Sequence, residues 1–329
     1  MSDAQEHGSE TLLRVEALRT WFPVRAGLLQ RPAAWIRAVD GVDLCVDAGR
    51  TLALVGESGC GKTTVGRSIL RLVEPSGGRV FFEGTDLLAL APAALHAVRR
   101  RLQIVFQDPM ASLDPRLRVR DAVAEGMQAF GIGDDEAERS ERVAALLRRV
   151  RLDPSHMDRF PHELSGGQRQ RVCIARALAV EPRLLVCDES VSALDVSIQA
   201  QILNLLLDLQ EELGLAYLFI THDLGVVRHL AHRVAVMYLG QIVEAGPTAR
   251  VFEDPRHPYT RALLAAMPSV DPSRRSVAVH ARGDVPSPLR PPPGCRFHTR
   301  CPEAFARCRA EAPALVVRDD GASRCVLSV

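Results

Sequence analysis

The chain has 329 residues, of which 47% are hydrophobic and 25% charged, so it is long enough for one large domain with an appendage or for two domains. Its 41 Lys and Arg residues nearly balance its 40 Asp and Glu residues, and a net charge of +1 gives no reason to expect nucleic-acid binding. Residues 1–10 are polar and acidic, unlike a signal peptide, and no apolar run approaches the roughly 18 residues of a membrane span. We therefore expect a cytosolic protein that contacts membranes only through partners.

Residues 11–55 alternate short apolar runs with turns, which predicts antiparallel strands leading into a buried parallel strand over 51–55. Trp21 and Phe22 lie in the first hairpin region, where an aromatic ring could stack on an adenine base. We favour Phe22 for this role, with Trp21 as the second choice. A place in the core or at its rim is an equally good interpretation of either ring.

A glycine-rich turn, Gly-Glu-Ser-Gly-Cys-Gly-Lys-Thr, follows the strand at 51–55, and helical apolar spacing follows over 64–72. This is the context of a phosphate-binding P-loop, in which glycines let backbone N–H groups point at phosphate oxygens and the helix N-terminus adds its dipole. Lys62 would reach the β- and γ-phosphates, and the Thr63 hydroxyl would bind Mg²⁺. The predicted nucleotide-binding residues here are Gly56, Ser58, Gly59, Cys60, Gly61, Lys62, Thr63 and Thr64.

Lys62 is the only lysine in the chain, and arginine takes every other strongly basic position. A compact ammonium group fits between phosphates where a planar guanidinium does not, so the single lysine supports the P-loop interpretation. The alternative is a glycine-rich turn that carries a surface lysine.

The next segments predict a hairpin over 77–90, a short helix over 91–101 and a strand over 102–107 that ends at Gln107. In open α/β sheets ligands bind beyond the carboxyl ends of the strands, so Gln107 would face the nucleotide. Residues 116–162 are largely helical by pattern, and we interpret the charge-rich stretch 134–151 as a solvated helix face.

A Ser-Gly-Gly-Gln turn at 165–168 opens an apolar helix over 172–180. Its free N–H groups, hydroxyl group and helix dipole make it a second predicted anion site, formed by Ser165, Gly166, Gly167 and Gln168. One nucleotide site does not need two phosphate cradles, so the duplication points to dimerisation.

An apolar strand over 184–188 ends in two carboxylates, of which Asp188 would hold Mg²⁺ and Glu189 would polarise the attacking water. The turn at 192–195 leads into a predicted helix over 196–213. A further apolar strand over 216–220 places His222 at another strand end, within reach of a γ-phosphate; such a histidine taken alone is more often structural.

These motifs together resemble the nucleotide-binding subunit of an ABC transporter over residues 11–255. The resemblance rests on Walker A at 56–63, the Q-loop residue Gln107, the signature at 164–168, Walker B at 184–188 with Glu189, the D-loop at 192–195 and the switch residue His222. It implies an α/β P-loop NTPase fold with a RecA-like core, an antiparallel β subdomain and a helical signature subdomain at about 108–170. It also implies ATP hydrolysis, with Lys62, Glu189 and His222 as catalytic residues and Thr63, Gln107 and Asp188 at the Mg²⁺ ion.

The family pairs two such subunits head to tail, so that the signature turn of one completes the ATP site of the other. ATP closes the dimer, hydrolysis reopens it, and the motion drives two transmembrane permease subunits, with a solute-binding protein acting indirectly. The resemblance therefore places the chain at the cytoplasmic face of the inner (plasma) membrane, as a peripheral subunit attached through the permeases.

The sequence after 255 resembles the tail of oligopeptide/dipeptide importer ATPases, a tail shared by the peptide/nickel branch. The resemblance rests on His-Pro-Tyr-Thr-Arg at 257–261, the proline-rich segment 282–288 and Gly-Cys-Arg-Phe-His-Thr-Arg-Cys-Pro at 294–302. The stretches 105–109 and 112–116 resemble the "F" ATPase of such systems, which implies a paralogous "D" ATPase as partner. We expect a small cysteine-containing extension over 256–329.

Four of the eight cysteines, Cys45, Cys60, Cys173 and Cys187, are interpreted as small buried apolar residues. The other four, Cys295, Cys301, Cys308 and Cys325, follow a C-x5-C-x6-C-x16-C pattern without the close pair of a structural zinc site. This wider spacing favours an iron–sulfur cluster, and some members of the resembled family carry a [4Fe-4S] cluster here. Zinc and free thiols are the alternatives, and we interpret His298 as a bystander.

The predicted function is thus that of an ATPase energising an importer of di- or oligopeptides, with nickel, glycosides or drugs as alternative cargo. A non-transport ABC ATPase of DNA repair or chromosome structure is less consistent with the chain, because about a hundred residues without sustained heptads separate Gly61 from Leu164. A translation-associated ABC protein would carry two cassettes, and a binding module with a dead site would lack Lys62 or Glu189.

Overall fold

The structure of the chain is a computed structural model that describes residues 10–26, 31–192, 194–267, 283–318 and 320–328. Residues 1–9 of the predicted N-terminal polar stretch, Ala193 of the predicted turn and Arg282 of the proline-rich segment lie outside these ranges. None of the helices in the described ranges has the length and apolar character needed to span a bilayer.

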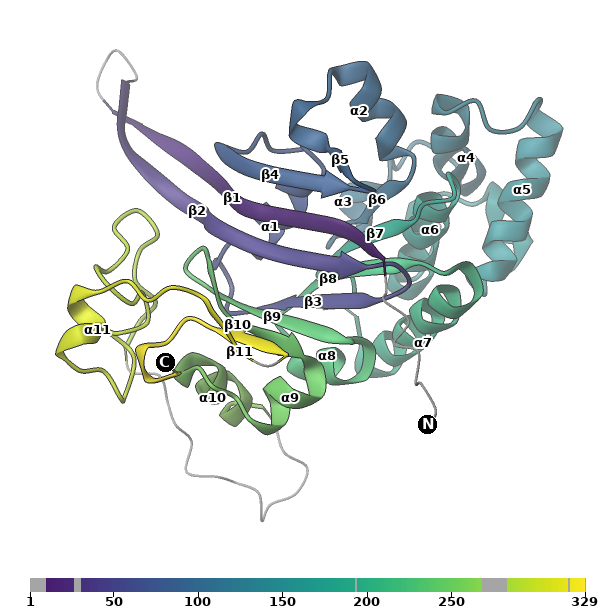
Figure 1. Cartoon of the computed structure of the whole chain (residues 1–329). Coiled ribbons are helices and arrows are strands. Elements are labelled where there is room, and N and C mark those ends of the chain that lie inside the picture. The colour runs from purple at the N-terminus through teal and green to yellow at the C-terminus, as the bar shows by residue number, and fades with distance from the viewer. Residues whose placement is uncertain (1–9, 27–30, 193, 268–282, 319, 329) are drawn as a thin grey trace, which may run out of the picture.

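The central sheet has eight strands in the order β11-β12-β10-β9-β3-β8-β7-β6 (Figure 1). The five strands from β9 to β6 run parallel, and β10, β12 and β11 are added antiparallel at one edge. Their bounds are β3 Thr51–Val55, β6 Leu102–Val105, β7 Leu184–Asp188, β8 Ala216–Thr221, β9 Arg233–Tyr238, β10 Gln241–Pro247, β11 Val316–Arg318 and β12 Gly321–Ser323. Every residue of β3, β7 and β8 is buried, as is typical of parallel strands covered on both faces.

A second, antiparallel sheet has the order β2-β1-β4-β5. Its strands are β1 Thr11–Ala26, β2 Arg31–Asp47, β4 Gly77–Phe82 and β5 Thr85–Asp86, which confirms the predicted early strands and the hairpin near 77–90. Apolar side chains of this sheet share one core with β3, β8 and the helix α1 (Lys62–Ile69), whose Val65 and Ile69 are fully buried. Helix α1 therefore packs against both sheets.

Helices α4 to α6 form a separate layer at one end of the molecule, on the right in Figure 1. They pack through apolar side chains on α7 and on the face of β7 and β8. The described helices are α2 Pro92–Arg99, α3 Pro109–Ser112, α4 Val119–Ala129, α5 Glu136–Arg149, α6 Gly166–Leu178, α7 Val196–Leu213, α8 Leu224–Leu230, α9 Thr248–Glu253, α10 Pro258–Ala265 and α11 Ala306–Ala310. Short 3₁₀ turns span Leu87–Ala89, Pro154–Asp158, Pro161–Glu163 and Val326–Ser328. In α5 only Val143 and Leu147 are buried, in keeping with the predicted solvated face.

The C-terminal region continues the fold of the preceding residues. Strand β12 pairs with β10, so the β11–β12 hairpin extends the central sheet. The buried carboxylate of Glu244 on β10 accepts hydrogen bonds from the N–H groups of Arg256 and His257 at 2.9 and 2.8 Å, which fixes the start of α10. Tyr259 and Phe297 share a core with β3 and β9. The predicted boundary at 255 thus falls within one continuous core, and the division into 11–255 and 256–329 stays a prediction.

Candidate active site

The loop between β3 and α1 takes a shape that only glycine permits at two of its positions. Gly61 has φ 107°, and a Cβ atom there would lie 2.1 Å from the carbonyl oxygen of Ala38. A Cβ atom on Gly56 would lie 2.2 Å from the carbonyl oxygen of Met237. Gly61 is the N-cap of α1 and supplies no side-chain hydrogen bond, so N–H groups of the first turn are available to an anion.

The Lys62 side chain lies inside this loop and is only 4% exposed. Its ammonium group donates hydrogen bonds to the carbonyl oxygens of Gly56 at 2.8 Å and Glu57 at 3.0 Å. Backbone carbonyls therefore hold the single lysine of the chain at the predicted phosphate position. Among the described residues, no carboxylate lies close enough to its ammonium group to form an ion pair.

Two carboxylates lie at the carboxyl end of β7, beside this loop. Asp188 is 1% exposed and accepts a hydrogen bond of 2.8 Å from the Thr63 hydroxyl. Burial raises the pKa of Asp188, and the hydrogen bond from the Thr63 hydroxyl opposes this rise. A cation bound there would therefore reduce the free-energy cost of keeping the buried carboxylate ionised. The structure thus brings together the predicted Mg²⁺ ligands Thr63 and Asp188, which are 125 residues apart.

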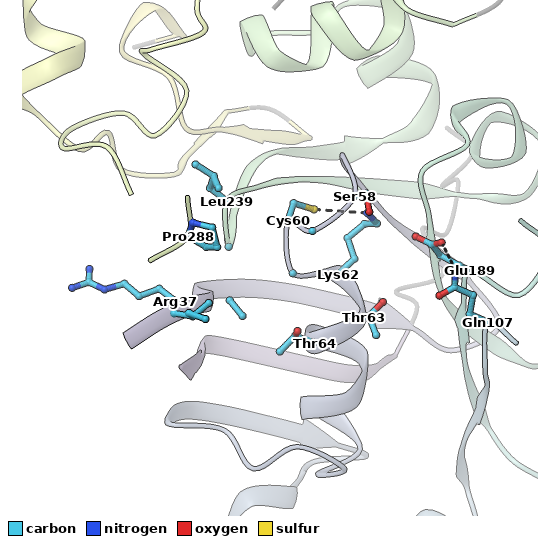
Figure 2. A pocket seen from close by; sticks show the side chains of 15 residues that line it. Arg37, Ser58, Cys60, Lys62, Thr63, Thr64, Gln107, Glu189, Leu239 and Pro288 are labelled. Atoms are coloured by element: carbon cyan, nitrogen blue, oxygen red, sulfur yellow. Dashed lines mark hydrogen bonds between the residues drawn. The ribbon is translucent and has the colours of Figure 1, made fainter. Parts of the chain in front are cut away.

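Glu189 is approached from two further strand ends. The Gln107 side-chain amide donates a hydrogen bond of 3.0 Å to one carboxylate oxygen, and Nδ1 of His222 lies 3.6 Å from the other (Figure 2 shows the first contact). Glu189 itself has φ 46°, a left-handed conformation that is costly for a residue with a side chain. Its N–H group is held by the carbonyl of Ile220 at 2.9 Å. The three predicted residues Gln107, Glu189 and His222 therefore form one constellation.

Two hollows meet at this constellation and share Ser58 and Glu189. The first, of about 260 Å³, is lined by seven of the eight predicted loop residues, Ser58 to Thr64, together with Gln107. The second, of about 350 Å³, is lined by Gly56 and His222. All predicted P-loop residues therefore border one of the two hollows.

The predicted signature turn lies elsewhere. Ser165 is the N-cap of α6; its hydroxyl accepts from the Gln168 N–H at 3.3 Å, and the Gln168 side chain accepts from the Ser165 N–H at 2.8 Å. Ser165 is exposed, and none of the four predicted residues from Ser165 to Gln168 lines either hollow. Within one chain, therefore, the signature turn and the Lys62 loop are not parts of the same cavity.

The two aromatic candidates for adenine stacking are distinguished by their contacts. The Trp21 ring lies under the Arg37 guanidinium at 4.9 Å and donates a hydrogen bond of 3.2 Å to Asp40. Phe22 is 38% exposed and is paired across the hairpin with Ile36, which lines the first hollow. Neither ring lines the hollow itself, and the role of Phe22 stays a prediction.

Several residues at the site were not identified as site residues from the sequence. Ile36, Ala38, Gly240 and Pro288 line the first hollow. Glu57, an unspecified position of the loop motif, is paired with Arg300 at 2.8 Å. These contacts join segments far apart in the chain, so no local pattern could have revealed them.

The four late cysteines are gathered in the C-terminal region. The N–H of Cys295 donates to the carbonyl of Cys308 at 2.9 Å, and Cys308 and Cys325 are buried. Burial is the main cause that raises the pKa of Cys295, and it raises that of Cys301 to about 11, so both thiols are protonated at neutral pH. Among the residues that the structure describes, no group of three or more His, Cys, Asp or Glu is placed to hold a metal ion. The described residues therefore do not support the predicted iron–sulfur cluster.

Comparison with known protein families gives two matches along the chain. Residues 39–192 match the family described as ABC transporter, and residues 243–308 match the family described as oligopeptide/dipeptide transporter, C-terminal region. The first match contains the Lys62 loop, Gln107, the signature turn and both carboxylates; the second contains Tyr259 and three of the four late cysteines.

Individual relatives agree with both matches. The chain is 53% identical, over 95% of its length and 88% of the relative's, to a probable peptide ABC transporter ATP-binding protein of Sinorhizobium fredii. It is 49% identical to the oligopeptide transport ATP-binding protein AppF of Bacillus subtilis, over 92% and 93% of the two chains. It is 56% identical to the glutathione import ATP-binding protein GsiA of Escherichia coli over 84% of its length, and spans 45% of that longer protein.

Solved structures show the same fold. A dimeric ATP-binding cassette in a post-hydrolysis state, bound to ADP and phosphate, matches with a TM-score of 0.63 and 28% identity over 72% of this chain and 98% of its own. The protein cbiO1 of Clostridium perfringens matches with the same score and identity over 74% and 92% of the two chains.

Proposed function

Since the chain belongs to the ABC transporter family, as an ATP-binding subunit that hydrolyses ATP, we propose that it energises the import of di- and oligopeptides. The proposal rests on the order in which the two family matches occur along the chain. An ABC cassette is followed by the C-terminal region of oligopeptide/dipeptide transporters in one chain, and the named relatives are peptide, oligopeptide and glutathione importer subunits.

We assign the chemistry of ATP hydrolysis to the constellation around Glu189. The loop N–H groups and Lys62 would hold the β- and γ-phosphates, and Mg²⁺, when bound at Thr63, Asp188 and Gln107, would neutralise the developing charge. Glu189, oriented by Gln107 and His222, would accept a proton from the attacking water. Positioning and charge neutralisation supply most of the catalysis of phosphoryl transfer, and these groups are the part of that machinery that one chain provides.

We infer that each ATP site is completed by a second ATPase subunit, of the paralogous D type. The support is the separation seen within one chain, where the exposed Ser165 turn lines neither hollow at the Lys62 loop. In a head-to-tail pair, the Ser165, Gly166, Gly167 and Gln168 turn would reach the phosphates held by the other subunit.

A third hollow, of about 760 Å³, suits the contact with a permease subunit. It is lined by β6 and the loop after it, by α4 and by α6, and it shares Gln107 with the nucleotide hollow. A permease segment seated there would touch the residue that hydrogen-bonds Glu189, which links transport to hydrolysis. Such a contact would hold the subunit at the cytoplasmic face of the membrane.

The proposed function is tested by reconstituting the chain with its second ATPase, two permeases and binding protein in vesicles. We expect ATP-dependent uptake of labelled di- or oligopeptides, and ATP hydrolysis that depends on assembly because the isolated subunit holds half-sites. Uptake of nickel, a glycoside or a drug instead of peptides would replace the cargo assignment. High hydrolysis by a proven monomer, insensitive to permeases, would contradict the transport function.

For the late cysteines, the [4Fe-4S] cluster is retained as a proposal to be tested against zinc and free thiols. Its support is the wide spacing of Cys295, Cys301, Cys308 and Cys325 in sequence, together with the backbone hydrogen bond that joins Cys295 to Cys308. Anaerobically purified protein would show broad visible absorption and about four irons per chain if the cluster forms. A colourless sample with one zinc, or with neither metal, would reject it. As a control, Cys45→Ser should have the same metal content as the wild type, because this exposed thiol lies outside the four late cysteines.

A further inference from the structure

The loop Cys295–Cys301 is anchored against the core of the ATPase fold. Phe297, 1% exposed, has its ring centroid 5.3 Å from that of Tyr238, at the end of β9, and 5.3 Å from that of Tyr259 on α10. The N–H groups of Arg300 and Cys301 both bond to the Phe297 carbonyl at 2.9 Å. The loop therefore holds its two arginines, Arg296 and Arg300, in fixed positions.

One of these arginines reaches the phosphate-binding loop. The Arg300 guanidinium makes two hydrogen bonds to the Glu57 carboxylate, at 2.8 and 3.1 Å, and Arg300 is only 8% exposed. The Glu57 N–H donates to the Tyr259 hydroxyl at 2.9 Å, and the Glu57 carbonyl accepts from Lys62 at 3.0 Å. A single loop residue is thus held by two side chains of the C-terminal region and by the lysine.

The other arginine is bonded to residues at and beside the wall of the first hollow. Arg296 is hydrogen-bonded to the Asp40 carboxylate on β2 and to the carbonyl of Leu239. Leu239 lines the hollow, as does Pro288, whose carbonyl accepts from the Arg37 N–H at 3.3 Å. The C-terminal region therefore builds part of the cavity in which the triphosphate would lie (Figure 2).

We propose that Arg300 is a positioning residue for ATP, which neutralises Glu57 and fixes the phosphate-binding loop, so that the C-terminal region is part of the ATP site. This inference rests on the proposed assignment of the Lys62 loop to ATP. Glu57 places a negative charge beside a site for a polyanion, where it would repel the triphosphate. The bidentate, largely buried Arg300 cancels that charge, and a lysine cannot reproduce its two parallel hydrogen bonds.

The test is the dissociation constant of MgATP for the full-length chain, measured by calorimetry on four variants. Arg300→Gln leaves the Glu57 carboxylate unopposed and is expected to weaken binding about tenfold. Glu57→Gln leaves the guanidinium unopposed and is expected to strengthen binding severalfold. The double variant, with neither charge, is expected to return to within about threefold of the wild type, and Arg300→Lys is expected to fall between wild type and Arg300→Gln.

A merely structural role of the pair would weaken binding in both single variants, so the opposite signs are diagnostic. The matched control is Arg307→Gln, which removes a guanidinium from the exposed 2.8 Å pair with Glu311 in the same region and should change nothing. The inference is overturned if Arg300→Gln binds within twofold of wild type, or if adding Glu57→Gln restores nothing. If thermal melting shows Arg300→Gln unfolded, the double variant decides: near-normal binding supports the inference and tenfold weaker binding overturns it.

Lys62→Ala separates this inference from the assignment on which it rests. If the wild type does not bind MgATP, or if Lys62→Ala binds as well as the wild type, the ATP site itself is misassigned and the inference falls with it. If Lys62→Ala weakens binding while the Arg300 variants do not, only the role of Arg300 is lost.

Discussion

Replacement of Glu189 by Gln is expected to reduce steady-state ATP hydrolysis by the assembled complex at least a hundredfold, while MgATP still binds. The amide keeps the size of the side chain and can still contact Gln107, but it cannot accept a proton from water. General-base catalysis typically contributes 10²- to 10⁴-fold, which sets the expected loss. Phosphate release and MgATP binding, measured on the same preparation, check the two halves of this prediction.

The matched control for this variant is Glu212→Gln, which neutralises an exposed glutamate paired with Arg149 at 2.9 Å, at the C-terminal end of α7. It should hydrolyse ATP at the normal rate. Normal turnover by Glu189→Gln would show that the proton is accepted by another group, and a loss of MgATP binding would show that the carboxylate has a structural function instead.

Replacement of Lys62 by Ala is expected to lower the hydrolysis rate by about two to three orders of magnitude, as for loss of a principal charge stabiliser. The ammonium group is the only lysine donor in the chain and already lies within the loop, bonded to the carbonyls of Gly56 and Glu57. MgATP binding should weaken as well. Hydrolysis by the complex and nucleotide titration of the full-length chain measure the two effects.

Lys62→Arg distinguishes charge from shape, because it keeps the positive charge in a planar group that cannot fit between the phosphates. We expect this variant to be nearly as inactive as Lys62→Ala. Since the side chain is 4% exposed, a thermal melt must show that both variants remain folded. Full activity in either folded variant would mean that the phosphate-binding loop is misassigned.

The sequence was sufficient to predict four neighbouring strands of the central sheet, β3, β8, β7 and β6, and the constellation at their carboxyl ends. Strands β3, β7 and β8 and helix α7 lie within one residue of their predicted ranges, because each is a continuous apolar run or a strongly periodic helix. Parallel strands place their carboxyl ends at one edge of a sheet, so Asp188, Glu189 and His222 could be expected beside the Lys62 loop before any contact was known.

The contribution of the C-terminal region could not be predicted in the same way. Arg300 and Glu57 are 243 residues apart, and although Arg300 lies in the quoted sequence at 294–302, no local pattern links it to Glu57. The pairing of β12 with β10 is also non-local, and a strand of three residues gives too short a pattern to recognise. The spacing of the late cysteines predicted a cluster, whereas no group of three or more His, Cys, Asp or Glu among the described residues is placed to hold a metal ion.

The most direct test of the account is whether ATP joins two cassettes through the Lys62 loop of one and the Ser165 turn of the other. The mass of the Glu189→Gln protein should be measured by sedimentation with and without MgATP, alone and mixed with the second ATPase subunit. The account predicts an ATP-dependent particle of two cassettes that Ser165→Arg abolishes. Particles that stay monomeric in both mixtures while ATP is bound, or a pair indifferent to Ser165→Arg, would contradict it.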